Sequence, residues 1–532
     1  MADEVYDAFL ESMRDLEQFR IDYLHEHQGP GLQRDDPDLR RLIESLAFFS
    51  ARTHIASARQ LRSMQEETTR RLFPALAAPV PAMGVVCAVP NRRLYESHRV
   101  PRGSSVVLSD GEHETTFTTM ADVKVLPVTQ GVLSRKILPD GNTRWSLPFR
   151  GAFPSTEDLG SFPLYINYVD DFQSSLRIFE ALRENLIDAH IEFSGGDMAK
   201  SELITASVDF DGWQAEASAL ADGPIESERW WFQLPQQDLV LKFKTPAPPP
   251  GWQSFTIHFD IGQSWPRDLH LSSDVFLPFA TPVINQTRCY ADPVVWDGTS
   301  DTFTLCHPDG SGYQLHTLKG VYRVDGGDMS PLYNGVFGSE TGSYLLQESR
   351  RAGAAGTYQL SINLPESFMD PVTISSDVVW YQPGFARLKS RGQSVALASG
   401  KIPGTTWQIL GDMVSQDVVR LGQREEATEL FVLNNKSFIN KSELILLLEL
   451  LGTPWAGRFA PLRDLISEVR TERQPMTSDD DSATSMIVYN IVFDDPSETI
   501  APLVEIFARH LENFLDCWCS EAAIVVRATV TT

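Results

Sequence analysis

The stretch that decides the fold begins Asp35-Asp36-Pro37-Asp38-Leu39-Arg40-Arg41-Leu42-Ile43-Glu44-Ser45-Leu46-Ala47-Phe48-Phe49. Asp36 is suited to cap a helix, because its carboxylate can accept hydrogen bonds from the free amides of the first turn. Pro37 follows at the first helical position, where a missing N–H costs nothing. Apolar residues then recur at steps of three and four, and no Gly or Pro interrupts before Pro74. The pattern predicts one helix from about residue 37 to residue 72.

The residues after this helix predict a stiff connector and then β-strands. Three prolines between residues 74 and 81 predict an extended segment that excludes helix. Short runs rich in β-branched residues follow, and each predicts a strand. These runs cover residues 84–89, 100–108, 115–119 and 123–128.

The remaining sequence predicts a multidomain protein of mixed α+β class. Residues 162–169 form a candidate strand, Asp170-Asp171 a helix cap, and an apolar helical stripe follows. A similar order closes the chain, with a strand at 486–493 and a stripe after Asp494-Asp495. The two stripes comprise Leu176, Phe179, Leu182 and Leu186, and then Leu503, Phe507, Leu511, Phe514 and Trp518. A duplication could explain both units, but common strand–cap–helix patterns explain them more simply.

Composition shifts divide the chain into four expected parts. Residues 1–80 are a helical segment with the long helix, and residues 81–245 are an α+β domain. Residues 251–400, with many short runs split by Gly, Asp and Pro, are a β-rich domain of the sandwich or barrel kind. Residues 401–532 are a C-terminal α+β domain. The Pro-rich residues 245–251 would be a stiff, extended linker and hinge.

Composition and charge limit the classes of function. The chain has 45 Lys and Arg against 71 Asp and Glu, a net charge of −26. Overall charge therefore excludes binding to bare nucleic acid or to an anionic membrane surface. Five cysteines form no disulfide framework and fit a reducing compartment. The start lacks a signal-peptide pattern, and the longest apolar run, residues 444–451, is too short to cross a bilayer. We therefore expect a cytoplasmic protein.

Patterns that carry catalysis are absent from the sequence. It contains no Gly-rich dinucleotide motif, no Walker-type phosphate loop and no Gly-x-Ser-x-Gly nucleophile elbow. His25-Glu26-His27 places its two His on different sides of a helix, and Cys517-x-Cys519 has no second pair to complete a metal site. Cys306-His307 precedes a turn. We expect no catalytic residue, no cofactor and no metal.

Two amphipathic helices carry the candidate protein interface. The residues that could pack in a helical bundle or against a partner are Phe9, Met13, Leu16, Phe19, Leu42, Leu46 and Phe49. Residues 38–71 also carry seven Arg against four acidic residues. This basic helix could be a solvated face packed along its own chain. It could instead dock on an acidic neighbour, including a second copy of the chain.

Several short motifs occur in a specific order along the chain. They are residues 41–48 (Arg-Leu-Ile-Glu-Ser-Leu-Ala-Phe), 101–104 (Pro-Arg-Gly-Ser), 117–119 (Phe-Thr-Thr), 122–127 (Asp-Val-Lys-Val-Leu-Pro) and 279–285 (Phe-Ala-Thr-Pro-Val-Ile-Asn). Ala291-Asp292-Pro293-Val294 and Asp297-Gly298 follow. Each motif is weak alone, but the order resembles that of the TssF family of the bacterial type VI secretion machine. The last third of the chain matches that family only in a strand–helix–strand finish.

The resemblance implies a structural subunit of the baseplate wedge. Two copies would pair with one TssG, carry TssK and join TssE, the sheath and the VgrG hub. The wedge would seat on the inner-membrane complex, template the sheath and relay the trigger for contraction. The resemblance implies a place in the bacterial cytoplasm, docked at that complex, with no direct membrane insertion and no nucleic acid.

A second hypothesis is a cytoplasmic carbohydrate-active or carbohydrate-binding β-rich protein. Trp230-Trp231-Phe232 and Trp252 could line a sugar-binding surface, with carboxylates facing each other across a cleft. In a chain with 11 Trp, burial or a protein interface is the simpler reading. A related subunit of a phage tail or another contractile device is a third candidate, with nearly the same mechanism.

Overall fold

The computed structural model describes residues 2–26, 37–109, 114–195, 203–300, 302–310, 312–335, 342–349, 357–364, 371–383, 394–398, 400–415, 424–434, 436, 438–451, 457–475, 485–494, 500–519 and 522–531. The chain divides into two compact units. Unit 1 comprises Met1–Ala77 and Arg420–Val432, and unit 2 comprises Ala78–Val419 and Leu433–Thr532. Helices and several sheets occur together, so the predicted mixed α+β, multidomain class is confirmed.

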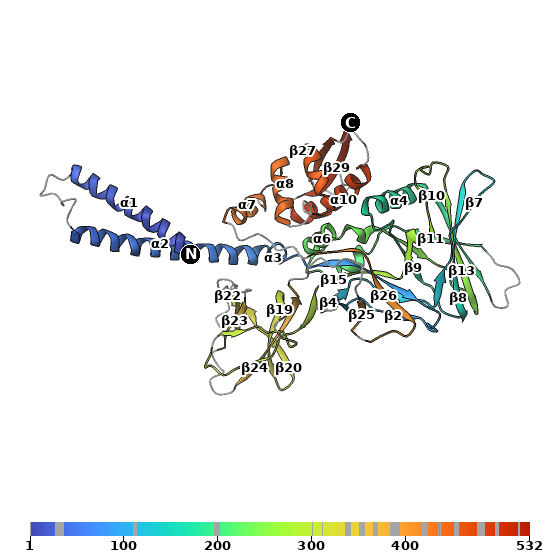
Figure 1. Cartoon of the computed structure of the whole chain (residues 1–532), viewed down its shortest axis with the longest axis horizontal. Coiled ribbons are helices and arrows are strands. Elements are labelled where there is room, and N and C mark those ends of the chain that lie inside the picture. Colours follow the sequence, from blue (N-terminus) through green and yellow to red (C-terminus); the bar gives the residue numbers. More distant parts are fainter. Residues whose placement is uncertain are drawn as a thin grey trace. The chain divides into compact units, whose positions relative to one another are not determined.

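Unit 1 is built on a helical hairpin. Helix α1 (Ala2–Glu26) runs back along α2 (Pro37–Leu72), as Figure 1 shows in blue. The bounds of α2 confirm the predicted long helix, which at 36 residues is about 54 Å long. Asp36, the predicted cap, lies outside the described residues.

Helix α2 packs through a narrow apolar face, and the two helices differ in the sign of their net charge. Ile43, Ala47 and Ala51 are buried, and their spacing of four places them on one face of α2. Helix α1 carries eight acidic residues and two Arg, whereas α2 is basic. The basic helix therefore has an acidic neighbour in its own chain.

The connector after α2 starts as a helix. Residues Pro74–Ala77 form the short helix α3, and the amides of Leu76 and Ala77 donate to the carbonyl of Phe73 at 3.1 and 3.0 Å. The prediction of a wholly extended connector was wrong at this turn, because a proline at the first helical position loses no hydrogen bond. Phe73 also packs edge-on against Phe431 of α7 (Arg424–Asn434), at 5.6 Å between ring centroids.

A closed barrel of six strands opens unit 2. Its order is β1-β15-β4-β3-β25-β26, so strands far apart in the sequence pair with one another. The strands are β1 (Met83–Pro90), β3 (Ser105–Ser109), β4 (Glu114–Thr119), β15 (Ala280–Ile284), β25 (Ser394–Leu397) and β26 (Thr405–Val414). A small pair, β2 (His98–Val100) and β5 (Val123–Val125), accompanies it. All four predicted strand regions after the connector contain strands.

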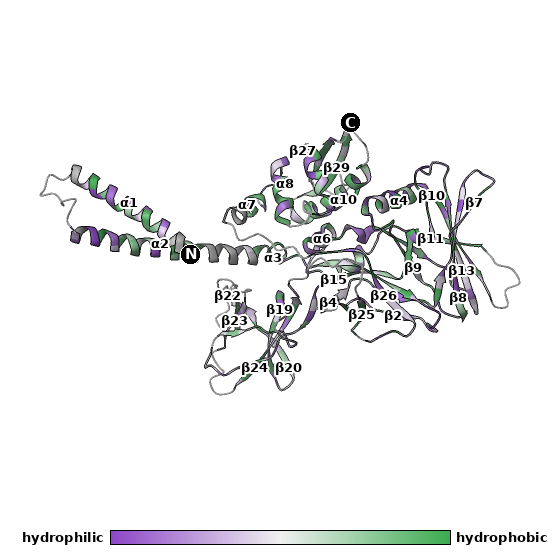
Figure 2. Ribbon diagram, in the orientation of Figure 1, coloured by the Kyte–Doolittle hydropathy of each residue, from purple (hydrophilic) through white to green (hydrophobic). Residues whose placement is uncertain are grey.

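A nine-stranded antiparallel sheet follows the order β14-β9-β12-β11-β10-β13-β8-β6, with β7 paired to β8. Its strands are β6 (Val128–Gln130), β7 (Ser134–Ile137), β8 (Thr143–Ser155), β9 (Ser161–Ile166), β10 (Leu186–Ser194), β11 (Leu203–Asp209), β12 (Val240–Lys244), β13 (Trp252–Ile261) and β14 (Phe276–Pro278). One face carries a cluster of aromatic rings, with Phe149, Phe162 and Phe255 at 4.9–5.4 Å between centroids. Figure 2 shows hydrophobic residues along these strands.

The residues predicted to cap a helix after β9 do so. Asp171 precedes α4 (Phe172–Asn185), and its carboxylate accepts from the amide of Ser174 at 2.8 Å. Leu176, Phe179 and Leu182 are buried along α4, as the stripe predicted. Leu186, the last residue assigned to that stripe, instead begins β10.

The Pro-rich residues 245–251 are a loop inside one sheet. They connect β12 to β13, and both strands belong to the nine-stranded sheet. The prediction of a hinge between domains at this point was therefore wrong, because sheet pairing holds both ends of the loop together. The proposed four-part division stays a prediction, and the barrel draws its strands from three of the four parts.

A two-sheet sandwich is inserted between barrel strands β15 and β25. One sheet holds β16 (Thr287–Tyr290), β17 (Val294–Trp296), β19 (Gln314–Asp325), β20 (Asp328–Pro331) and β24 (Val372–Tyr381). The other holds β18 (Thr302–Thr304), β21 (Tyr333–Asn334), β22 (Ser343–Ser349) and β23 (Thr357–Asn363). Trp296, Leu360 and Trp380 belong to the common core.

The C-terminal part pairs helices with a three-stranded sheet. Its elements are α8 (Lys441–Leu451), α9 (Ala460–Leu465), β27 (Ile466–Pro475), β28 (Ser485–Asp494), α10 (Ala501–Trp518) and β29 (Ala523–Thr531). Strands β28 and β29 are parallel, with α10 as their crossover, and the predicted α10 stripe is buried. Around α4 the strands β9 and β10 run in opposite directions. The two strand–helix units therefore differ in topology.

Helix α6 (Pro224–Gln233) lies in the interior of unit 2, after α5 (Gln214–Ser218) and before the short helix η1 (Pro235–Asp238). The Arg229 guanidinium donates to the carbonyls of Leu451 and Ala78, each at 3.0 Å. Gln233 donates to the carbonyl of Ser415 at 2.7 Å. Because a buried cation is costly unless it is hydrogen-bonded, these contacts fix α6 to three distant segments.

Candidate protein interface

The aromatic residues considered for sugar binding are core residues. Trp230, Trp231, Phe232 and Trp252 are all buried. Trp231 stacks on Phe459 at 5.2 Å, and the indole N–H of Trp252 donates to a backbone carbonyl. A sugar ring cannot reach these faces, so the aromatic argument for a carbohydrate protein is removed.

The residues predicted to form an interface lie on the hairpin. Leu42, Leu46 and Phe49 of α2 are 57%, 51% and 65% exposed, and Phe19 of α1 is 68% exposed. Phe9, Met13 and Leu16 are half-buried on α1. The buried face of α2 in the hairpin is therefore formed by Ile43, Ala47 and Ala51. The larger side chains of Leu42, Leu46 and Phe49 stay exposed to solvent.

Leu42, Leu46 and Phe49 form a continuous stripe, because steps of four and three keep residues on one side of a helix. Charged residues border it: Arg40 pairs with Glu44 at 3.1 Å. An apolar surface with a polar rim is typical of a protein interface. Figure 2 shows hydrophobic and hydrophilic residues interspersed along both helices of the hairpin.

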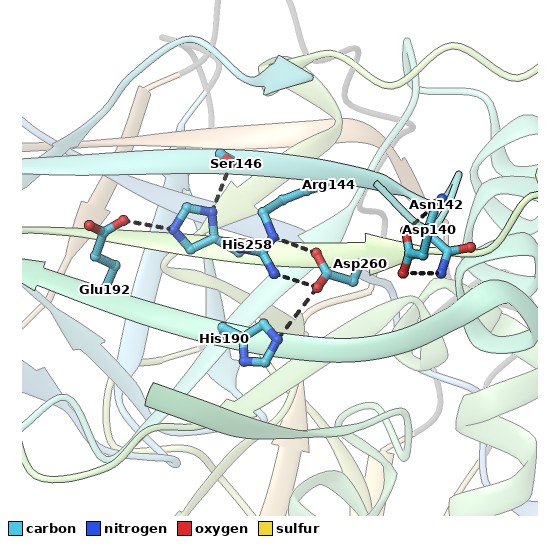
Figure 3. A network of polar contacts seen from close by, with 8 residues as sticks. All are labelled: Asp140, Asn142, Arg144, Ser146, His190, Glu192, His258 and Asp260. Atoms are coloured by element: carbon cyan, nitrogen blue, oxygen red, sulfur yellow. Dashed lines mark hydrogen bonds and ion pairs between the residues drawn. The ribbon is translucent and has the colours of Figure 1, made fainter. Parts of the chain in front are cut away.

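A polar network on the nine-stranded sheet lies on the face opposite the aromatic cluster (Figure 3). The Arg144 guanidinium donates twice to Asp260, both at 2.6 Å, and His190 lies 3.5 Å from the same carboxylate. Burial acts to raise the pKa of Asp260, but Arg144 outweighs it and lowers that pKa. The pair crosses neighbouring strands β8 and β13 and stabilises their register.

The second arm of this network runs from Ser146 to His258 to Glu192. The Ser146 hydroxyl lies 2.8 Å from His258 Nδ1, and His258 Nε2 lies 3.1 Å from Glu192. Burial lowers the pKa of His258, so its neutral ring donates through Nε2 and accepts at Nδ1. Ser146 and His258 are direct cross-strand partners, so the arrangement is a sheet ladder.

Other titratable residues noted in the sequence are held by local contacts. Cys289 lies 3.3 Å from His307 Nε2, but burial raises the pKa of the thiol and lowers that of the imidazole, so both stay neutral. Cys306 and Cys517 are exposed free cysteines. Within the described ranges, no group of three or more His, Cys, Asp or Glu could hold a metal ion. His27 lies outside those ranges.

Sequence reasoning missed one buried cluster, at His510 of α10. Its Nδ1 and Nε2 lie 2.8 Å from Glu228 of α6 and 2.8 Å from Asp238 of η1. The ring stacks on Trp231 with centroids 3.3 Å apart. Glu228 and Asp238 lie more than 270 positions before His510, and no sequence pattern links residues so far apart. The cluster could therefore be recognised only in the folded structure.

None of the described helices is long and apolar enough to cross a bilayer.

Comparison with known proteins identifies the class of this protein as a component of the type VI secretion system. A sequence model of the family described as "Type VI secretion system, TssF" matches residues 25–352, more than half of the chain. The chain belongs to the TssF family, as the motif order predicted.

Solved structures extend the likeness beyond the matched residues. One similar chain comes from a type VI secretion system TssK-TssF-TssG baseplate subcomplex, with 15% identity and a TM-score of 0.72. That likeness covers 93% of this chain and 96% of the other. A chain of a type VI baseplate complex is 16% identical, with a TM-score of 0.62, over 100% and 97% of the two chains. At these identities the likeness shows the fold. No curated protein matches the sequence.

Proposed function

We propose that this chain is a structural, non-enzymatic subunit of the type VI secretion baseplate that assembles with TssG and TssK. Family membership and the fold shared with chains of baseplate complexes support this role. In the full proposal, two copies bind one TssG, and the wedge joins TssE, the sheath and the VgrG hub. The wedge sits in the bacterial cytoplasm at the inner-membrane complex and relays the trigger for contraction.

The observation that carries the proposal is the exposed stripe of Leu42, Leu46 and Phe49 on α2. Burying the exposed half of each of these side chains in an interface would stabilise a complex by about 1–2 kcal/mol per residue, less the cost of ordering the partners. An assembly subunit has a partner that supplies this burial, whereas a lone enzyme would leave the stripe in water.

Native mass spectrometry of the co-expressed proteins tests the assembly. The full chain is expressed with TssG and TssK and purified through a tag on TssG. We expect a core of two copies of this chain with one TssG, joined by TssK. If this chain remained monomeric in the presence of both partners, that result would contradict the proposal.

The substitution Leu46→Asp tests the stripe itself. Leu46 is 51% exposed, so the substitution should leave the helical signal of the free chain unchanged but place a charge in the interface. We expect recovery with TssG to fall at least tenfold. Val132→Asp is the matched control, because Val132 is an apolar residue of unit 2 that is 80% exposed. Equal recovery of Leu46→Asp and wild type would exclude this stripe as the interface.

A further inference from the structure

A short turn after β1 is held in one conformation by backbone contacts. The Asn91 amide donates to the Gly404 carbonyl at 2.8 Å, and the Leu94 amide donates to the Asn91 carbonyl at 3.0 Å. The Asn91 side chain accepts from the amide of Arg93 at 2.9 Å. Leu94 is buried and anchors the turn in unit 2.

Gly404 fixes the position of this turn against the start of β26. Its φ is +80°, a conformation that glycine adopts easily. A Cβ atom at this position would lie 2.2 Å from the amide nitrogen of Leu94. The two backbones therefore approach as closely as they do only because residue 404 has no side chain.

The turn presents two arginines and an aromatic ring to solvent. Arg92 and Arg93 are exposed, and neither forms an ion pair with any residue in the described part of the chain. Tyr95 is 65% exposed, and its ring packs at 5.4 Å against that of Phe153 from β8, which is 50% exposed. We call Arg92, Arg93, Tyr95 and Phe153 the Arg-Tyr surface.

The charge of this segment is opposite to that of the chain. Residues 91–102 contain four Arg and one Glu, whereas the chain carries −26. Arg99 pairs with Asp122, and Arg102 donates to the carbonyl of Glu216 at 2.9 Å. Within the described ranges, Arg92 and Arg93 thus have no acidic partner that neutralises their charge.

We propose that the Arg-Tyr surface binds an acidic segment of a partner protein, with an apolar side chain of that segment against Tyr95 and Phe153. Arg and Tyr, together with Trp, are enriched among the residues that dominate binding energy at protein interfaces. The turn is already fixed, so binding costs little backbone ordering. This surface is separate from the hairpin stripe, so the inference goes beyond the proposed function.

Charge selects this occupant over two others. A nucleic acid would bring many phosphates to a chain of −26, and the two free arginines could offset few of them. A second copy of the chain would bring the same large negative charge and mutual repulsion. A short acidic segment needs only local complementarity.

Fluorescence anisotropy of the full chain with a labelled peptide of repeated Glu-Asp-Leu triplets tests the proposal. We expect wild type to bind, and Arg92→Glu with Arg93→Glu to bind at least tenfold more weakly. Tyr95→Ala should weaken binding about threefold or more but keep the salt dependence of wild type, because both arginines remain, whereas the charge variant should lose that salt dependence. The matched control is Arg267→Glu with Arg527→Glu, the same charge change at two other exposed arginines, and we expect a change below twofold.

Several results would overturn the proposal. They are no binding by wild type, an equal loss in the matched control, or tighter binding of a single-stranded oligonucleotide than of the peptide. A dimer in sedimentation velocity that Arg92→Glu with Arg93→Glu dissolves would assign the surface to a second copy. Leu46→Asp should bind the peptide like wild type, so failure here is distinguishable from failure of the hairpin interface.

Discussion

His510 holds a proton between two carboxylates in the interior of unit 2. Both ring nitrogens lie 2.8 Å from acidic oxygens, and both can donate only when the imidazole is charged. Burial acts to lower the pKa of His510, but Asp238 and Glu228 outweigh it and raise that pKa above its usual value. Trp231 covers one face of the ring, and Gln214 of α5 donates to the other oxygen of Glu228. The cluster therefore ties α10 to α6 and η1 through charge.

This cluster predicts a pH dependence of stability. A histidine with a raised folded pKa stabilises fully below its unfolded pKa of about 6.5, and the stabilisation is lost as pH rises through the folded pKa. We expect the free energy of unfolding of unit 2 to fall with pH more steeply in wild type than in His510→Gln, with a difference in slope of up to about 1.4 kcal/mol per pH unit. Urea unfolding between pH 6 and 9 measures both slopes.

His316→Gln is the control for this pH profile. His316 is buried, and burial lowers its pKa to about 4, so the ring is neutral throughout the measured range. The slope of this variant should match wild type above about pH 7.5, where His316 is neutral in the unfolded chain as well, even where its stability is lower. Below that pH, titration of the unfolded His316 adds a rise with pH to wild type that the variant lacks. Equal slopes in wild type and His510→Gln would show that His510 does not contribute to the pH dependence. Glu180, whose pKa burial raises to about 7, is present in all three proteins and cancels from the comparison.

At the scale of single residues, the sequence predicts contacts between residues that are close together along the chain. Asp171 could be recognised as a cap because its partner amide is three residues away. His510 could not be recognised, because Glu228 lies 282 residues earlier and only the packing of α10 on α6 joins them. The same holds for Gly404, whose role depends on a turn some three hundred residues before it.

At the scale of elements, periodicity predicts a helix and its length but not which face is covered. Two neighbouring sets of apolar residues run along α2, and either could pack on α1. The structure assigns Ile43, Ala47 and Ala51 to the inside because two of them are small enough for close helix approach. Leu42, Leu46 and Phe49 remain outside. The wrong predictions at this scale, a fully extended connector and a hinge at residues 245–251, ignored helix-start geometry and sheet pairing.

The buried and exposed sets on α2 predict opposite results from similar substitutions. Ala47→Asp places a carboxylate inside the hairpin next to the acidic α1, which should destabilise unit 1 by about 2 kcal/mol or more. We expect protease sensitivity of the free chain to rise within the hairpin for Ala47→Asp and to stay unchanged for Leu46→Asp. Equal sensitivity of both variants would mean that α1 does not cover the Ala47 face.

At the scale of the whole molecule, the order of short motifs predicted the family, because motif order survives where overall identity falls to 15%. The domain architecture was harder to predict. The barrel closes with β1, β15 and β26, each more than a hundred residues from the next along the chain, and the sandwich is inserted between two of its strands. Sequence reasoning that cuts the chain into consecutive pieces has no local signal for such pairing.

This interleaving predicts how the molecule opens. Unit 2 joins distant segments in shared sheets, whereas unit 1 rests on a hairpin with a narrow buried face. In hydrogen exchange of the full chain, we expect amides of α1 and α2 to exchange through local opening and amides of β1 and β13 only near global unfolding. Binding of TssG should slow exchange in the hairpin by at least tenfold and leave β13 unchanged. With Leu46→Asp the slowing should vanish, whereas with Val132→Asp it should persist. Slowing confined to unit 2 would move the principal interface away from the hairpin.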